Sequence, residues 1–199
     1  MSSLNKNFLA LDLELNTNAE FKTTKIIQVG IAVGNFFKPE EIFTKSWYIN
    51  PNEPLSEHIQ KLTGITEKNV QEESVPVEQV ASELSALIEQ YQVFTNPITW
   101  GGNDAEELKS LFKENNIDFP HFGRRIIDVK TNFIFLEYAN DRSLAGSLKH
   151  SMEKYKISFE GEAHRADVDA FNTLRFFFFL TERQRKLEQM IDNMKSIKY

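Results

Sequence analysis

One short stretch near the start of the chain constrains its fold more than any other. Residues 9–16 read Leu-Ala-Leu-Asp-Leu-Glu-Leu-Asn, an apolar run that predicts a buried β-strand but carries two acids, Asp12 and Glu14. Because side chains alternate along a strand, we expect both carboxylates on one face, where they repel each other unless one is protonated or a cation lies between them. The alternative is an exposed edge strand with ordinary surface acids. The residues in the rest of the chain distinguish these two interpretations.

The composition is that of one folded domain. The chain has 199 residues, of which 41% are hydrophobic and 26% charged, close to the globular average. No apolar run is long enough to cross a bilayer, and residues 1–6 lead into a strand rather than into a signal-peptide core. The absence of cysteine excludes disulfides and thiolate-bound zinc or iron–sulfur clusters. We therefore expect a cytoplasmic protein that does not act at a membrane.

The formal net charge of −6 argues against a protein that holds nucleic acid through a broad basic surface. It is compatible with a metal-dependent nuclease, because acids that bind cations account for part of the negative charge. Affinity for the substrate would then come from the cations and from a few local basic residues.

The order of the predicted elements indicates an α/β fold. β-Branched and apolar runs bounded by turn residues predict an antiparallel meander of three strands, at residues 8–13, 25–33 and 43–49. Two further strands are predicted at residues 98–100 and 126–128, and each leads into a helix. Helices are predicted at residues 56–62, 76–88, 104–115, 129–137, 144–155 (capped by Ser143) and 166–180. This order predicts a mixed sheet covered by helices.

The C-terminal segment is expected to form a unit of its own. We expect a domain of residues 1–180, followed at residues 181–199 by an amphipathic helix that packs on the domain or forms an interface with a second copy or another protein. The apolar stripe of this helix consists of Leu187, Met190, Ile191, Met194 and Ile197. Just before it, four consecutive phenylalanines at 176–179 point all round a helix, which favours core burial over base stacking.

Two other segments contribute chemically useful side chains. Asp104 follows a glycine turn at the start of a predicted helix, where a carboxylate also suits the helix dipole or a cap. His164 and Asp169 lie near the start of the last core helix, and they converge only if His164 sits in the loop before it, which Gly161 favours. Taken singly, each residue has an ordinary structural explanation.

Taken together, these residues form an oxygen-rich ligand set with one histidine. Asp12, Glu14, Asp104 and Asp169 come from three segments and include no thiolate. Such a set suits Mg²⁺ or Mn²⁺ better than structural zinc. A lone histidine beside oxygen ligands is better suited to accept the proton of an attacking water than to bind the metal.

These segments resemble the three exonuclease motifs of the DEDDh group, the DnaQ-like 3′-to-5′ exonucleases with a ribonuclease H-like fold. The resemblance runs from residue 9 to about 174 and implies a mixed five-stranded sheet, an antiparallel meander followed by parallel strands, flanked by helices. The motif stretches are Leu11–Glu14, Trp100–Asp104 and His164–Ala170, with further similarity at Asn50–Pro51, Ile59–Thr66 and Asp128–Lys130.

The resemblance also implies roles for the residues. Asp12 would bridge two divalent cations, Mg²⁺ or Mn²⁺. Glu14 and Asp169 would complete the first metal site, and Asp104 would hold the second cation mainly through water. His164 would act as the general base that releases nucleoside 5′-monophosphates from the 3′ end of single-stranded RNA or DNA. The candidate contacts to the terminal nucleotide are Leu15, Asn16, Gly64, Ile65 and Arg165.

One position departs from the commonest family pattern. Many members place Asn four residues before the second-motif Asp, where this chain has Trp100. Trp-Gly at this point resembles the branch of histone-mRNA 3′-exonucleases and KapD-like bacterial proteins, which favours RNA. Two alternatives remain open: a proofreading or DNA-repair exonuclease that acts with a polymerase, and a catalytically silent nucleic-acid-binding scaffold on the same fold.

Overall fold

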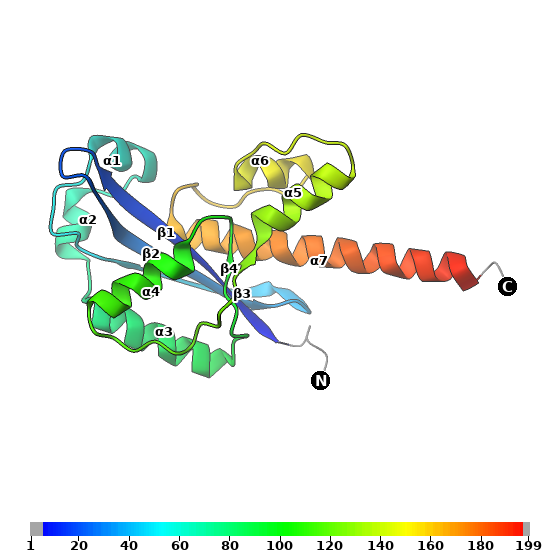
Figure 1. The fold of residues 1–199 in the computed structure, drawn as a ribbon, viewed down its shortest axis with the longest axis horizontal. Coiled ribbons are helices and arrows are strands. Elements are labelled where there is room, and N and C mark those ends of the chain that lie inside the picture. The colour runs from blue at the N-terminus through cyan, green and yellow to red at the C-terminus, as the bar shows by residue number, and fades with distance from the viewer. Residues whose placement is uncertain (1–5, 197–199) are drawn as a thin grey trace.

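A mixed five-stranded sheet forms the centre of the molecule (Figure 1). The computed structural model describes residues 6–196. Its strand order is β3-β2-β1-β4-β5, with β1, β2 and β3 antiparallel and with β4 and β5 parallel to β1. The strands are β1 (Asn7–Asn18), β2 (Thr23–Asn35), β3 (Lys38–Tyr48), β4 (Ile98–Thr99) and β5 (Ile127–Asp128). The predicted meander followed by parallel strands is confirmed, and each of its three strands is longer than predicted.

Helices cover both faces of the sheet. Helices α3 and α4 lie on one face, whereas α7 lies on the other with α5 and α6 beside it (Figure 1). The bounds are α1 (Glu57–Thr63), α2 (Glu67–Glu72), α3 (Val77–Tyr91), α4 (Asp104–Glu114), α5 (Val129–Ala139), α6 (Leu148–Lys154) and α7 (Ala166–Ser196).

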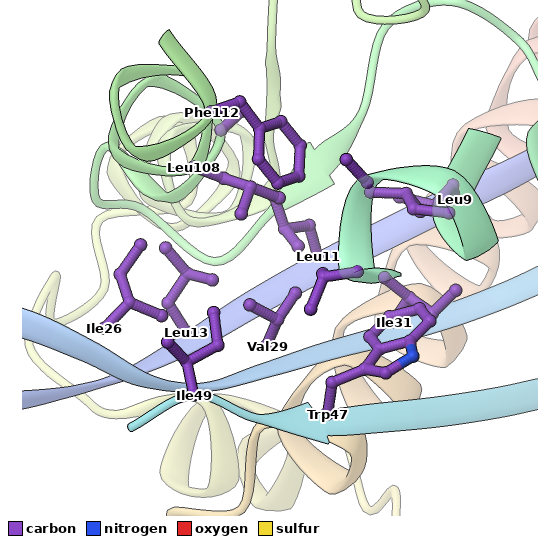
Figure 2. Close-up of a cluster of buried hydrophobic side chains, with 14 of the residues drawn as sticks. Leu9, Leu11, Leu13, Ile26, Val29, Ile31, Trp47, Ile49, Leu108 and Phe112 are labelled. Carbon is purple, nitrogen blue, oxygen red and sulfur yellow. The ribbon is translucent and has the colours of Figure 1, made fainter. Parts of the chain in front are cut away.

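Strand β1 separates two hydrophobic clusters. Its odd-numbered leucines, Leu9, Leu11 and Leu13, pack with Leu108 and Phe112 of α4 and with side chains of α3 (Figure 2). The even-numbered side chains point to the opposite face, which α7 covers. Full burial of one such leucine or phenylalanine contributes about 1.5–3 kcal/mol, so this alternation fixes the register of β1. The same alternation places Asp12 and Glu14 on the α7 face.

Side chains cap both of the first two helices, but only the first of these helices was predicted from the sequence. Ser56 caps α1 by accepting a hydrogen bond from the backbone N–H of Ile59, and Gly64 ends this predicted helix at φ +70°. Helix α2 was not predicted. It has six residues and begins with a capping box in which Thr66 and Asn69 exchange hydrogen bonds. One buried residue, Val70, is too little to give a hydrophobic pattern.

The prediction that Ser143 caps a helix beginning at residue 144 is wrong. Helix α6 begins at Leu148, and Ser147 caps it by accepting a hydrogen bond from the N–H of His150. The intervening residues form a loop that includes Gly146 at φ +149°. Lys154 holds this loop by donating to the carbonyls of Ser143 and Ala145. These contacts from the last residue of α6 stabilise residues 143–145 as a loop, and helical spacing does not reveal them.

Helix α7 is one continuous helix of 31 residues, not a core helix followed by a separate tail. Residues 180–186 include no glycine or proline and consist mainly of good helix formers, so nothing interrupts the helix near residue 180. Its outer part extends beyond the other elements (Figure 1), and its apolar side chains are exposed instead of packing back on the domain. Residues 1–5 and 197–199, including Ile197 of the predicted stripe, lie outside the described part of the chain.

The four phenylalanines at 176–179 lie where α7 crosses the sheet. Phe176 and Phe178 are buried, and the other two are partly buried against the same cluster, so the prediction of core burial is confirmed. Within residues 6–196, no helix combines the length and the apolar character needed to cross a membrane.

Candidate active site

The site begins at the middle of β1. Asp12 is paired with Gly30 of β2, and Glu14 is paired with Gln28. Directly paired residues on adjacent antiparallel strands share a face, so all four positions lie under the start of α7. The register shifts immediately after Glu14, which marks a β-bulge. Bulges increase the local twist of a strand and redirect its side chains, so the twelve-residue strand bends at its acidic end.

A tight turn before α7 brings the second part of the site onto this face. Gly161 has φ +85° and His164 has φ +65°, so the chain reverses sharply before the helix begins. The Oδ2 atom of Asp169 accepts hydrogen bonds from the backbone N–H groups of His164 at 2.7 Å and Arg165 at 3.2 Å. The expected arrangement, with His164 in the loop and Asp169 in the first turns of the helix, is confirmed.

The third segment follows β4. Gly101 and Gly102 both have φ +68°, and they turn the chain so that Asp104 becomes the first residue of α4. Asp128, at the end of the neighbouring strand, accepts a hydrogen bond from the N–H of Gly101 at 2.9 Å and also caps α5. Since β4 runs parallel beside β1, this turn delivers Asp104 next to the acidic end of β1.

Three acids converge closely, with a fourth beside them. Asp12, Glu14 and Asp169 each offer a carboxylate oxygen, and these oxygens all lie within 4.8 Å of one another. Asp104 is outside this close group, but its charge helps to raise the pKa values of Asp12 and Glu14. All the donors are oxygens, which is the chemistry that hard divalent cations prefer. The residues therefore fit a hard divalent cation.

Burial raises the pKa values of all four acids, and repulsion by the other acids of the cluster adds to this shift at Asp12 and Glu14. Burial is the larger cause for Asp12, whose pKa is well above its usual range, and for Glu14, whose pKa is about 7. Burial also raises the pKa of Asp104 to about 6, although backbone N–H groups at Asp104 and Leu13 oppose this shift. Burial raises the pKa of Asp169 too, against the hydrogen bonds from the turn. A cation would relieve the repulsion among these carboxylates.

His164 lies at the solvent side of the acid cluster. Its residue is exposed, and its positive charge would lower the pKa of Asp169, so the imidazole lies close enough to interact electrostatically with the cluster. An imidazole at the open edge of an acidic site can take a proton from a water molecule and release it to solvent.

The five predicted nucleotide contacts lie at the end of β1, between α1 and α2, and in the turn before α7. Asn16 is buried, and its side chain holds the loop before α1 through Glu53, Pro54 and Ser56. Ile65 is also buried, in a small cluster with residues of α1 and α2, whereas a side chain added at Gly64 would meet open space. The remaining two are Leu15, partly buried at the bulge, and Arg165, exposed beside Asp167.

Two residues that were not predicted to belong to the site shape it. A Cβ atom at Gly30 would lie 2.0 Å from the backbone carbon of Ala166, so only glycine admits α7 at this distance. The buried side chain of Gln28 accepts a hydrogen bond from the N–H of Ala166 at 3.0 Å. A glycine and a glutamine inside the β-branched run of residues 25–33 were the available signal.

The comparisons with known proteins agree with this geometry. The RNase T exonuclease family model matches residues 9–177. The chain is 38% identical over 190 residues to the 3′-5′ exonuclease DinG of Bacillus subtilis, an alignment that covers 92% of this chain and 18% of that protein. The chain thus spans about a fifth of the length of the curated relatives it matches.

Two solved structures show the same fold. The nuclease domain of 3′hExo, described as a DEDDh family member bound to rAMP, has a TM-score of 0.75 at 20% identity, over 92% of this chain and 95% of that one. The zinc-bound E. coli ExoI–ssDNA complex has a TM-score of 0.70 at 16% identity, over 95% of this chain and 43% of that one. The fold is therefore the ribonuclease H-like fold of DEDDh exonuclease domains. Given the match over residues 9–177, this chain belongs to the RNase T exonuclease family.

Proposed function

We propose that this protein is a metal-dependent 3′-to-5′ exonuclease that releases nucleoside 5′-monophosphates from single-stranded RNA or DNA. The convergence of Asp12, Glu14 and Asp169 within 4.8 Å, with Asp104 beside them, is the observation that carries this proposal. Four acids that three segments bring together destabilise a fold through repulsion unless they bind cations. A metal-dependent hydrolase accounts for them, and a silent scaffold does not.

Two divalent cations, Mg²⁺ or Mn²⁺, are the proposed cofactors. Asp12 would contact both, Glu14 and Asp169 would complete one site, and Asp104 would hold the other mainly through water. When bound, such cations supply positive charge that stabilises the attacking and leaving oxygens of a phosphoryl displacement. The oxygen-only donor set and the raised pKa values of these acids support this assignment.

His164 is the proposed general base. Its imidazole would accept a proton from the attacking water and pass it to solvent, to which the residue is exposed. Asp169 supports this role because it accepts a hydrogen bond from the backbone N–H of His164. It also lies close enough for a positive charge on His164 to lower its pKa. The histidine would therefore act at the edge of the acid cluster, without serving as a ligand.

The proposed substrate is the 3′ end of a single strand, held near Leu15, Asn16, Gly64, Ile65 and Arg165. The similar structures support both chemistries, because 3′hExo was solved with rAMP and E. coli ExoI with single-stranded DNA. The relatives named 3′-5′ exonuclease DinG support the direction of digestion. The choice between RNA and DNA depends on contacts to the 2′-OH group.

The test uses purified protein with 5′-labelled RNA and DNA oligonucleotides of the same sequence. With Mg²⁺ or Mn²⁺, the label should pass through a ladder of fragments shortened from the 3′ end, and nucleoside 5′-monophosphates should accumulate. Excess EDTA and the Asp12→Asn variant should both stop the reaction. Endonucleolytic fragments, or digestion that persists in EDTA, would overturn the proposal.

A further inference from the structure

The turn that carries His164 is attached to the sheet by one side chain. Within residues 6–196, the Oε1 atom of Gln28 makes the hydrogen bond that joins residues 164–166 to a strand, by accepting from the N–H of Ala166 at 3.0 Å. The other two N–H groups of the turn are bonded to Asp169, inside the helix that the turn precedes. Gln28 therefore sets where the turn and the start of α7 lie relative to β2.

Gln28 also adjoins the acid cluster. It is paired with Glu14 on β1 and with Tyr48 on β3, so these three residues form a row across the α7 face of the sheet. The neighbouring row contains Asp12 and Gly30, where the missing side chain leaves room for the backbone of Ala166. The row of Asp12 and Gly30 leaves space for the turn, and Gln28 in the next row holds the turn in that space.

The chemistry of Gln28 is unfavourable for a residue that serves folding alone. The side chain is fully buried, and among residues 6–196 its Nε2 group finds no hydrogen-bond partner. An unsatisfied buried donor lowers stability, whereas a methionine of similar length would fill the space without one. The useful atom is the acceptor Oε1, which satisfies the otherwise orphaned first N–H of α7.

We propose that Gln28 is a positioning residue for the hydrolysis: its hydrogen bond to Ala166 holds the His164 turn in register with Glu14 and the acid cluster. This inference rests on the proposed function, because it assigns His164 a proton-transfer role. Gln28 itself does not touch the reacting atoms. Its effect is to keep the imidazole and the carboxylate of Asp169 at fixed places relative to β1.

The test compares Gln28→Met with Val29→Ala. Gln28→Met keeps the length of the side chain but removes the acceptor. Val29→Ala changes the next residue of the same strand, whose buried side chain packs in the cluster on the opposite face, and so controls for general destabilisation. Misplacement of a catalytic group by about 1 Å lowers rates by about 100-fold. We expect kcat of Gln28→Met to fall about 10- to 100-fold with KM changed less than about threefold, and Val29→Ala to keep its kcat.

Amide hydrogen exchange on the metal-free protein gives a readout independent of activity. Exchange at the N–H of Ala166 should accelerate at least about tenfold in Gln28→Met relative to Val29→Ala, because only the first loses the acceptor. Gln28→Glu retains an oxygen at the same reach, and its kcat at saturating Mg²⁺ should exceed that of Gln28→Met. Unchanged Ala166 exchange, or a Gln28→Met kcat equal to that of Val29→Ala, would overturn the inference.

The two proposals fail in different ways. An inactive wild-type protein refutes the proposed exonuclease function, and the exchange measurement still decides whether Gln28 fixes the turn. An active wild type with an equally active Gln28→Met variant refutes the positioning role alone.

Discussion

The Oδ2 atom of Asp169 accepts a hydrogen bond from the backbone N–H of His164 at 2.7 Å. The same residue contributes an oxygen to the acid cluster with Asp12 and Glu14. One carboxylate therefore closes the turn that presents the proposed base and also belongs to the proposed metal site. Asp12 has no such second task, so substitutions at these two acids should differ in their effect on stability.

Asp12→Ala and Asp169→Ala should both abolish Mg²⁺-dependent digestion, lowering the rate by at least about 1,000-fold, because each removes a proposed metal ligand. Asp12→Ala should leave the free energy of unfolding of the metal-free protein unchanged or higher, since it removes a crowded charge. Asp169→Ala should lower it by about 1–3 kcal/mol, because two N–H groups of the turn lose their acceptor.

Asp169→Asn separates the two tasks of this side chain. Its amide oxygen can still accept the hydrogen bonds of the turn, so the variant should be about as stable as the wild type but inactive. Denaturation in urea and digestion of a labelled oligonucleotide measure the two properties. Full activity of any of the three purified variants would contradict the proposed metal site.

The stability of the metal-free protein should fall as pH rises from 5 to 8. The pKa of Glu14 is about 7 and that of Asp104 about 6, against ordinary values of 4.5 and 3.8. At a pH between the ordinary and the raised pKa of each acid, the folded state holds a proton that the unfolded state has released. The free energy of unfolding therefore decreases as pH rises through this range. At about 1.4 kcal/mol per pKa unit, about two units for Glu14 and about one for Asp104 fall in this range, so we expect a loss of about 4 kcal/mol.

Urea denaturation in EDTA at several pH values measures this loss, and Mg²⁺ should reverse it at pH 8 because it binds the folded state. The Glu14→Gln/Asp104→Asn double variant should show a flatter profile. Glu83, whose pKa is lowered to about 2 by hydrogen bonds from Lys45 and other donors, stabilises the fold above about pH 4.5 and loses this contribution only as pH falls below that value, outside this window. A wild-type profile that rises between pH 5 and 8 would contradict the repulsion described for the cluster.

His164→Ala should lower kcat near neutral pH by about 100- to 10,000-fold, the range typical of a lost general base. The affinity for Mg²⁺, measured by calorimetry, should stay within about threefold of the wild type, because the proposed ligands are the four acids. His150→Ala, at an exposed position on α6, is the matched control and should retain full activity. A collapse of metal affinity in His164→Ala would identify this histidine as a ligand instead.

Gly30→Ala should impair both stability and activity. The added Cβ would lie 2.0 Å from a backbone atom of Ala166, so the start of α7 has to move away from β2, carrying Asp169 with it. Overpacking of this kind typically costs about 1–3 kcal/mol. At Gly34, on the same face of the same strand, a Cβ would meet only side-chain atoms, the nearest at 3.0 Å. Gly34→Ala should therefore be mild, and equal effects of the two substitutions on kcat would contradict this account.

Local patterns were sufficient to predict the parts of the site that depend on alternation and turn chemistry. The alternation of β1 predicted that Asp12 and Glu14 share a face, and Gly161 favoured the loop that contains His164. They could not predict the attachment of the turn to the sheet, because Gln28 and Ala166 are 138 residues apart in the chain. A hydrogen bond of that range leaves no period in the sequence, only a polar residue inside an apolar strand.

The errors in the predicted fold have a similar origin. Ser143 and Ser147 are equally good helix caps by residue type, and the lysine contacts that choose between them come from the far end of α6. At the end of α7, the apolar stripe left open packing on the domain or an interface, and the continuing helix carries the stripe past the sheet, so only the interface stays a prediction. Amphipathic spacing shows that a helix has an apolar face, and does not show whether another element covers that face.

Removal of residues 187–199 should leave a folded, active protein. Leu187, Met190, Ile191 and Met194 are 40%, 61%, 39% and 58% exposed, so within residues 6–196 this end of α7 buries little apolar surface. A chain ending at Lys186 keeps Arg183 over the ring of Tyr155 and Arg185 over the ring of Phe36, contacts that attach the helix to the domain. A chain ending at Leu180 loses both and should be less stable by about 1–2 kcal/mol. Thermal denaturation and oligonucleotide digestion check these outcomes, and unfolding of the longer truncated chain would contradict them. Sedimentation of the full chain and of the chain ending at Lys186 tests the expected interface. If the particle mass of the truncated chain is lower by more than the mass of the deleted residues, the exposed stripe joins two copies in the full-length protein.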